Sequence, residues 1–300
     1  MDGNEWLAGH FERHRPRLRG VAYRMLGSLA EADDAVQDTW LRLSRAGAED
    51  VENLGGWLTT IVARVCLNML RARNHRHEEP VPVHLPDAVV SPDGEPQPEE
   101  QALLADSVGL ALLVVLDTLT PDERLVFVLH DLFDVPFGQI GLLVDRSPAA
   151  AKQLASRARR RVRGAGIPAA PDPARQREVV DAFFAAARRG DFDALVAVLH
   201  PGVLLRIDAG TQHPEASMLI RGPAAVARQA ARGIRQMLRG PAAGLRPVLV
   251  NGSAGVVVTV DGQPFAVMSF TVADGKIAGI DAIADPGRIR KITDAVLTAG

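Results

Sequence analysis

Basic side chains gather in one short stretch near the middle of the chain. Residues 146–164 hold seven arginine and lysine residues and no acid, although the 300-residue chain has a net charge of −2. Affinity for a phosphate backbone depends on such a local surface rather than on the charge of the whole chain. A helix over 148–163 would carry on its outer face Ala149, Lys152, Gln153, Ser156, Arg160 and Arg163. Small side chains between long donors let a helix enter a major groove, so this face predicts DNA contact, with a solvated surface as the alternative.

A second polar stripe lies earlier in the chain, within residues 57–73. Thr60, Arg64, Asn68 and Arg71 follow one another at helical spacing, and the stripe ends in a basic tip at residues 71–76. The opposite face of this predicted helix is apolar and holds Leu58, Ile61, Val62, Val65 and Met69. The period of about 3.6 residues therefore predicts an amphipathic helix with one buried side.

The helix expected before it begins at Ser28, because Ser28 and Glu31 have the spacing of a capping box. Its apolar face holds Ala32, Ala35, Val36, Trp40 and Leu43. Its other face carries Asp33, Asp34, Gln37 and Asp38. These residue types fit a solvated side and a docking surface for a basic partner equally well.

The elements around the basic helix have strong start signals. Thr120, Pro121 and Glu123 combine a cap, a proline at the first helical position and a capping-box acid. A short helix over 137–144, a tight turn and a helix capped by Ser147 then follow, although Gly138 and Gly141 weaken the short helix. The inner face of the last helix is apolar, with Ala151, Leu154, Ala155, Ala158 and Val162. This arrangement predicts a helix-turn-helix.

Two breaks divide the chain. Residues 76–100 hold six prolines and seven acids, which predicts an extended, acidic linker, and glycine with three prolines marks a second linker at 165–173. The expected domains are residues 1–75 and 101–164, both all-α, and residues 174–300. In the last block, two helices broken at Gly190 precede strands with hairpin signals at Asn251-Gly252, Asp261-Gly262 and Asp274-Gly275. This order predicts an α+β domain, a curved sheet forming a cone.

Several of these segments together resemble a known protein family. The sequences DDAVQDTWLRL (33–43) and WLTTIVARVCLNMLRARNHR (57–76) look like region 2 of an extracytoplasmic-function (ECF) sigma factor of bacterial RNA polymerase. Residues 119–163 look like its region 4, and the block from 174 resembles the SnoaL-like (NTF2-like) extension of one subgroup. The resemblance implies a multi-domain fold and a function in promoter recognition and transcription initiation. Its implied partners are promoter DNA and core RNA polymerase, through the β′ and β subunits.

The resemblance also implies roles for individual residues. Docking on the β′ coiled coil would involve Asp34, Gln37, Asp38 and Trp40. The minus-ten element would be opened and held by Thr60, Arg64, Asn68, Arg71 and Arg73, where Arg64 replaces a frequent Asn. The minus-thirty-five duplex would be read by Ala149, Lys152, Gln153, Ser156, Arg157 and Arg160.

Regulation is expected to involve the linker and the tail. The segment 84–90 stands where the subgroup has Trp-Leu-Pro-Glu-Pro, and 285–289 is an altered Asn-Pro-Asp-Lys-Leu. The residues implied in a regulatory contact are His84, Leu85, Pro86, Asp87, Asp285, Pro286 and Arg288. The altered linker and tail suggest that this contact is rewired.

Two other functional classes compete with this interpretation. One is a ligand-responsive repressor with a helix-turn-helix, against which the polar stripe at 60–71 argues. The other is an enzyme in the C-terminal block, for which the candidate acids and bases are Asp208, His213, Glu215 and Asp281. We expect a regulatory domain rather than an enzyme, and a small-molecule ligand for it remains open.

No metal or other cofactor is expected. His75, His77 and His84 lack a cysteine or ordered carboxylate to complete a tetrahedral set, and Cys66 lies in an apolar helix face typical of a buried structural thiol. No apolar run approaches the roughly 18 residues that span a bilayer, and the first residues are polar. These features predict no membrane association and a cytoplasmic protein.

Overall fold

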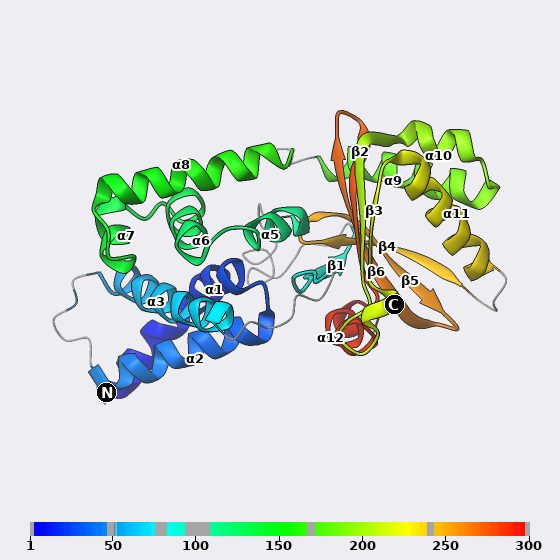
Figure 1. The fold of residues 1–300 in the computed structure, drawn as a ribbon. Coiled ribbons are helices and arrows are strands. Elements are labelled where there is room, and N and C mark those ends of the chain that lie inside the picture. The colour runs from blue at the N-terminus through cyan, green and yellow to red at the C-terminus, as the bar shows by residue number, and fades with distance from the viewer. Residues whose placement is uncertain are drawn as a thin grey trace. The chain divides into compact units, whose positions relative to one another are not determined.

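The computed structural model describes residues 3–46, 51, 53–75, 83–93, 109–166, 172–238 and 243–297. The chain divides into two compact units (Figure 1). Unit 1 combines Met1–Glu79 with Leu113–Ala165, and unit 2 combines Pro80–Leu112 with Gly166–Gly300. The two all-α blocks therefore fold as one unit, and most of the segment that connects them in sequence belongs to the other.

Unit 1 opens with three mutually packed helices, α1 (Gly3–Leu26), α2 (Leu29–Ala46) and α3 (Leu54–His75). Their core includes the fully buried Phe11, Leu18, Tyr23, Leu43 and Leu58. Helix α2 begins directly after Ser28, whose hydroxyl accepts a hydrogen bond from the Glu31 N–H at 3.4 Å. The Glu31 carboxylate does not complete the predicted capping box, because it pairs with Arg73 of α3 instead.

The rest of unit 1 comprises α6 (Pro121–Phe127), a π-helical turn η1 (Val128–Leu132), α7 (Phe137–Leu143) and α8 (Pro148–Gly164). The short helix α5 (Leu110–Leu116) crosses the boundary between the units. Both predicted start signals are confirmed. The capping box of Thr120 and Glu123 is present in full, and the Ser147 hydroxyl accepts from the Ala150 N–H at 3.2 Å.

The turn between α7 and α8 explains a glycine that sequence reasoning treats only as a weakness. Asp145 has a positive φ of 54°, and the Arg146 N–H donates to the Gly141 carbonyl at 2.9 Å. A Cβ at position 141 would lie 2.7 Å from the Arg146 carbonyl oxygen. Glycine is therefore needed there for the tight turn that sets α8 against α7.

Unit 2 is built on a seven-stranded sheet with the order β1-β4-β5-β6-β7-β2-β3. Neighbouring strands are antiparallel except β2 and β7, which are parallel. The strands are β1 (Val90–Pro92), β2 (Leu199–Asp208), β3 (Met218–Arg221), β4 (Gly244–Val250), β5 (Ser253–Val260), β6 (Gln263–Ala273) and β7 (Lys276–Ile283). The three predicted hairpins join β4 to β5, β5 to β6 and β6 to β7, and Asn251, Asp261 and Asp274 each have a positive φ.

One face of this sheet is covered by α9 (Pro173–Arg189), α10 (Phe192–Val198) and α11 (Pro223–Leu238). A short 3₁₀ turn, η2 (Pro214–Ala216), precedes β3. The break between α9 and α10 falls at Gly190, which has a φ of 68°, as the sequence predicts. The core under these helices includes Phe183, Phe270 and Leu205, so the predicted α+β architecture is confirmed.

The second face of the sheet is also covered at one end. Val256 and Val258 of β5 belong to the core under the helices, and Val257 between them points to the other side. Val257 is nevertheless fully buried. The terminal helix α12 (Pro286–Leu297) packs there against β6 and β1. Because β1 pairs with β4, a strand from the predicted linker forms one edge of the C-terminal sheet.

Candidate nucleic-acid interface

Helix α8 presents the basic face that the sequence predicts. Ala151, Ala155 and Ala158 are buried on its inner side. The side chains expected at a duplex are all exposed, namely Ala149, Lys152, Gln153, Ser156, Arg157 and Arg160. None of these cations makes a hydrogen bond or ion pair within the described residues, so their donors are free to meet phosphates or base edges.

Two other arginines of α8 serve the fold instead. Arg159 donates to Asp131 of η1 at 2.6 Å, and Arg161 donates to the nearly buried Glu123 of α6 at 2.9 Å. Arg161 also reaches the Thr118 carbonyl at 3.3 Å. The basic run therefore divides into arginines that anchor α8 and cations that remain available, a division that the sequence does not reveal.

The polar stripe of α3 is only partly free. Arg64 and Asn68 are exposed and have no polar partner among the described residues. The Thr60 hydroxyl donates to the Gly56 carbonyl at 3.0 Å. Arg71 and Arg73 are half-buried, the first paired with Asp122 at 2.9 Å and the second with Glu31. Before these two arginines could contact DNA, their ion pairs would have to open.

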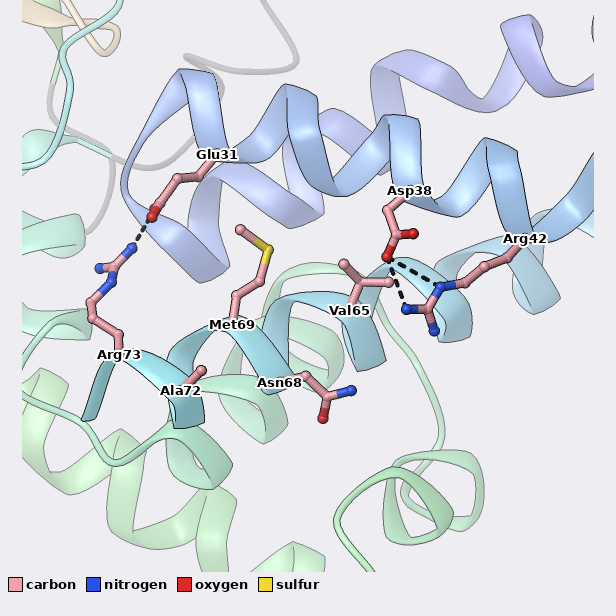
Figure 2. Close-up of a pocket in the computed structure, with 8 residues that line it drawn as sticks. All are labelled: Glu31, Asp38, Arg42, Val65, Asn68, Met69, Ala72 and Arg73. Carbon is pink, nitrogen blue, oxygen red and sulfur yellow. Dashed lines mark hydrogen bonds and ion pairs between the residues drawn. The ribbon is translucent and has the colours of Figure 1, made fainter. Parts of the chain in front are cut away.

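A pocket of about 300 Å³ lies between α2 and α3. It is lined by Glu31, Asp38, Arg42, Val65, Asn68, Met69, Ala72 and Arg73. Figure 2 shows the pair of Glu31 and Arg73 at one end and the pair of Asp38 and Arg42 at the other, with Val65 and Met69 between them. The apolar side chains of Val65 and Met69 can pack against a flat ring, and the Asn68 amide beside them can form hydrogen bonds with the edge of that ring.

Helix α6 is joined to the first three helices by more than the pair of Arg71 and Asp122. The Arg124 side chain is 3% exposed and donates to the Arg24 carbonyl at 3.1 Å. Asp117 pairs with the same guanidinium. Burial lowers the pKa of Arg124, and the Asp117 carboxylate opposes this shift. A buried, paired charge holds the first three helices and α6 in one arrangement.

We expect the substitution Asp122→Asn to weaken this arrangement without unfolding unit 1. The ion pair with Arg71 is partly exposed, so its loss should cost no more than about 1 kcal/mol in unfolding free energy. The freed Arg71 should strengthen binding of single-stranded DNA by a few-fold at low salt. Fluorescence titration with an oligonucleotide would measure this, with Asp193→Asn, at an exposed acid of α10, as the matched control. Equal affinity of the Asp122→Asn variant and the wild type would contradict the expectation.

The acidic face of α2 is exposed at Asp34 and Gln37. Asp38 is half-buried and pairs with Arg42 at 2.9 Å, and Asp33 accepts from Arg19 at 2.6 Å. Trp40 is half-buried with its ring 5.1 Å from that of Phe11. Of the four residues implied in polymerase docking, the structure therefore places Asp34 and Gln37 at the open surface, whereas Asp38 and Trp40 are half-buried.

Linker and tail residues meet in unit 2 around one buried carboxylate. Asp208 at the end of β2 is 0% exposed and accepts from Arg288 of α12 at 2.7 Å. It also accepts from the backbone N–H groups of Leu85 and Gly210, at 2.8 and 2.9 Å. Arg288 in turn donates to the Leu85 carbonyl at 2.7 Å and to Asp87 at 3.1 Å. We refer to Leu85, Asp87, Asp208 and Arg288 as the latch.

The other regulatory residues surround the latch. Pro86 is buried, whereas His84 is exposed with its Nδ1 3.5 Å from the Asp208 carboxylate. Asp285 caps α12 by accepting from the N–H groups of Gly287 and Arg288 at 2.7 and 3.0 Å, and Pro286 begins the helix. Gly210 has a φ of 79°, and a Cβ there would meet the Asp285 carboxylate at 1.9 Å.

Beyond the latch, the linker segment makes further contacts with unit 2 on both sides of β1. The Asn251 side chain accepts from the Val89 N–H at 3.1 Å, and the Asn251 N–H donates to the Val89 carbonyl at 2.8 Å. Arg177 of α9 pairs with Asp93 at 2.8 Å beyond the end of β1. The described part of the predicted linker, 83–93, is therefore extended as expected but is fastened to unit 2 along its length.

Of the four candidate acids and bases, two are buried in ion pairs and two are exposed. Asp208 and Asp281 are buried, and each is held by an arginine, with Arg206 donating to Asp281 at 2.5 Å. His213 and Glu215 are exposed next to η2, 3.6 Å apart. The buried carboxylates are thus engaged in structural pairs, and the exposed pair is solvated.

Cys66 is fully buried, as predicted, and burial raises the pKa of its thiol. It stays protonated and behaves as a small apolar side chain. Among the residues that the structure describes, no three His, Cys, Asp or Glu side chains are placed to hold a metal ion. His75 and His77, weighed above as ligands, lie outside the side chains described. No helix in the described ranges is long and apolar enough to cross a bilayer.

Comparison with known families defines the class of protein. Residues 10–76 match the family model of Sigma-70 region 2, and residues 109–162 match that of Sigma-70, region 4. A chain with both regions in this order is a sigma factor, and the second match includes α7 and all but the last two residues of α8.

Full-length relatives narrow the class further. The chain is 37% identical over 287 residues to the ECF RNA polymerase sigma factor SigJ of Mycobacterium tuberculosis, covering 93% of this chain and 91% of SigJ. It is 33% identical over 292 residues to the probable ECF RNA polymerase sigma factor SigI of M. tuberculosis, covering 96% and 97%. The chain therefore belongs to the ECF RNA polymerase sigma factors, which direct core RNA polymerase to promoters.

The fold agrees with this assignment beyond the two sigma regions. The crystal structure of M. tuberculosis SigJ matches with a TM-score of 0.74 and 34% identity, covering 94% of this chain and 97% of that one. The likeness thus extends through unit 2, whose helix-covered sheet agrees with the α+β domain expected for the C-terminal block.

Proposed function

We propose that α8 reads the minus-thirty-five element of the promoter. The observation that supports this most directly is the set of exposed, unpaired donors Lys152, Gln153, Arg157 and Arg160 on a helix whose other side is buried. Ala149 and Ser156 keep the surface low enough for close approach to a major groove. Base contacts would set specificity, and phosphate contacts would set the position of the helix on the duplex.

The second element of the proposal is capture of the minus-ten strand by α3. Arg64 and Asn68 are available immediately, and Arg71 and Arg73 would join them after their ion pairs open. The pocket beside Asn68 has the size and the mixed lining to hold one unpaired base. Binding of a single strand would then combine a basic track with the seating of a base.

Docking on core RNA polymerase would use α2. Asp34 and Gln37 provide an exposed acceptor surface for a basic partner, and Asp38 would extend it if its pair with Arg42 opened. We expect the double substitution Asp34→Ala and Gln37→Ala to weaken binding to purified core enzyme about tenfold, with little change in stability. Asp193→Ala, at an exposed acid of α10, is the matched control. Unchanged core affinity in the double variant would rule out this surface.

Unit 2 is proposed to regulate the sigma regions rather than to catalyse a reaction. The latch fixes the segment that follows region 2, so opening it would change how freely the two sigma regions can separate on polymerase. Structural pairing of Asp208 and Asp281 supports a regulatory domain over an enzyme. We further propose that unit 2 binds a small-molecule ligand. The protein would act in the cytoplasm, where RNA polymerase is found.

Run-off transcription tests the proposal as a whole. Full-length protein, a form ending after Gly164 and a form lacking the tail from Asp285 would be combined with core polymerase at equal concentration. We expect promoter-specific initiation from the full chain and altered activity from both shortened forms. Identical activity of all three would contradict regulation by unit 2, and substrate turnover abolished by Asp208→Ala or His213→Ala would favour the enzyme. Tight duplex binding without initiation would favour a repressor.

A further inference from the structure

A basic segment in unit 2 has no role in the function described so far. Between Glu215 and Asp261 the chain contains six arginines and no acid. Three of the six, Arg228, Arg232 and Arg235, lie on the single helix α11. This helix carries no acidic residue along its length, Pro223–Leu238. The concentration of charge resembles that of α8, in a domain that a sigma factor does not need for its two recognition regions.

The three arginines form one stripe. They are spaced by four and three residues, so they share a face of α11, and all three are exposed. The opposite face is built into unit 2, with Val226 and Ala227 fully buried. The stripe is therefore presented on a helix whose apolar side is already occupied by the core, and Figure 1 shows this helix beside α10.

The charges of the stripe are not neutralised within the fold. Among the described residues, none of the three arginines makes an ion pair, and the only contact found is from Arg235 to the Ala231 carbonyl of its own helix at 3.1 Å. The nearest packed elements bring acids on α9 and α10, including Asp181, Asp191 and Asp193, but none forms an ion pair with the stripe. Three adjacent cations without counter-charges repel one another, a cost that binding of a polyanion removes.

We propose that the stripe binds the phosphate backbone of duplex DNA. Three guanidinium groups on one helix face can each form charge-assisted hydrogen bonds with phosphate oxygens. The small residues Ala224 and Gly233 leave the exposed surface of α11 low enough for a duplex to approach. Anchoring in a membrane would need an unoccupied apolar face, which the described side chains of α11 do not provide. The inference rests on the sigma-factor function, which brings unit 2 into a complex that holds promoter DNA.

The test compares full-length protein with the variant Arg228→Gln, Arg232→Gln, Arg235→Gln, each bound to core polymerase. Binding to a promoter duplex would be measured over a range of salt concentrations. If each arginine contacts one phosphate, the slope of log affinity against log salt should become shallower by about 2.7, and the single variant Arg232→Gln should change it by about 0.9. The matched control, Arg175→Gln, Arg188→Gln, Arg189→Gln on α9, removes the same charge and should leave the slope nearly unchanged.

Phosphate contacts carry no sequence information, so the stripe effect should persist on a duplex in which both promoter elements are scrambled. The inference is overturned if the stripe and control variants lower the slope equally, which would indicate a general effect of net charge. It is also overturned if the slope is unchanged while affinity for core polymerase falls, which would identify an acidic protein surface as the partner. Failure of the wild type to initiate at a promoter would count against the sigma-factor function. The salt slope measured on the scrambled duplex tests the stripe independently of that function.

Discussion

Replacing Arg288 with alanine should lower the unfolding free energy of unit 2 by about 3–5 kcal/mol, because it removes the partner of a fully buried carboxylate. Among the described residues, Asp208 would keep the backbone N–H groups of Leu85 and Gly210 and the more distant His84 ring, but no guanidinium. The Leu85 carbonyl and Asp87 would lose the guanidinium that binds them. The segment 83–93 should therefore loosen as well as the domain, and denaturant unfolding of the full chain would measure the first effect.

The control for this prediction is Arg290→Ala, which removes an exposed arginine from the same helix and should change stability by less than about 0.5 kcal/mol. The double variant Asp208→Asn, Arg288→Met should recover part of the loss, since it removes the unpaired charge. Limited proteolysis would report release of the linker segment as new cleavage within 83–93. An Arg288→Ala variant as stable as Arg290→Ala would show that the latch does not hold the linker.

The double substitution Lys152→Ala, Arg160→Ala should weaken promoter binding by about 2–4 kcal/mol, or roughly 30-fold to 1000-fold. A lost base contact would relax sequence preference, whereas a lost phosphate contact would lower affinity on every sequence and reduce the salt dependence. Fluorescence anisotropy with a promoter duplex and the sigma-core complex would separate these effects. The stability of unit 1 should be unchanged, because both side chains are exposed and make no hydrogen bond or ion pair within the described residues.

Arg159→Ala provides the contrast on the same helix. It removes one positive charge rather than two, and it removes that charge from a side chain bound to Asp131, so it should cost stability and spare promoter affinity. If Arg159→Ala and the double variant weakened binding to the same extent per charge removed, α8 would be acting through its overall charge. In that case the exposed face would not be a reading surface.

Local signals in the sequence predict much of this fold. The cap at Thr120, the cap at Ser147 and the turn residues at Asn251, Asp261 and Asp274 each act within a few residues of the chain. Their geometry depends on neighbours along the sequence, so reading them in order is enough. Helical period likewise identifies the exposed side of α8 correctly, because its inner alanines recur every three or four residues.

Partners far apart in the chain escape this kind of prediction. The helical period of α3 predicts that Arg71 lies on the polar face, but nothing near it in the sequence indicates its partner Asp122. Likewise, the run of seven cations after Asp145 does not reveal that Arg159 and Arg161 bind acids within unit 1. The latch is the extreme case. Arg288 and Asp87 can be suspected from family resemblance, whereas the burial of Asp208 between them depends on sheet register that the sequence does not state.

The strand β1 has a consequence for the order in which the chain can fold. Val89 bonds to Asn251, 162 residues later in the sequence, and Leu85 bonds to Arg288, 203 residues later. During synthesis, the helices of region 2 can form early, whereas the sheet edge stays open until nearly the whole chain has left the ribosome. Contacts of such long range form slowly. Completion of unit 2 thus has to follow the synthesis of α12, and a chain interrupted before α12 would lack the Arg288 contacts that bind the linker.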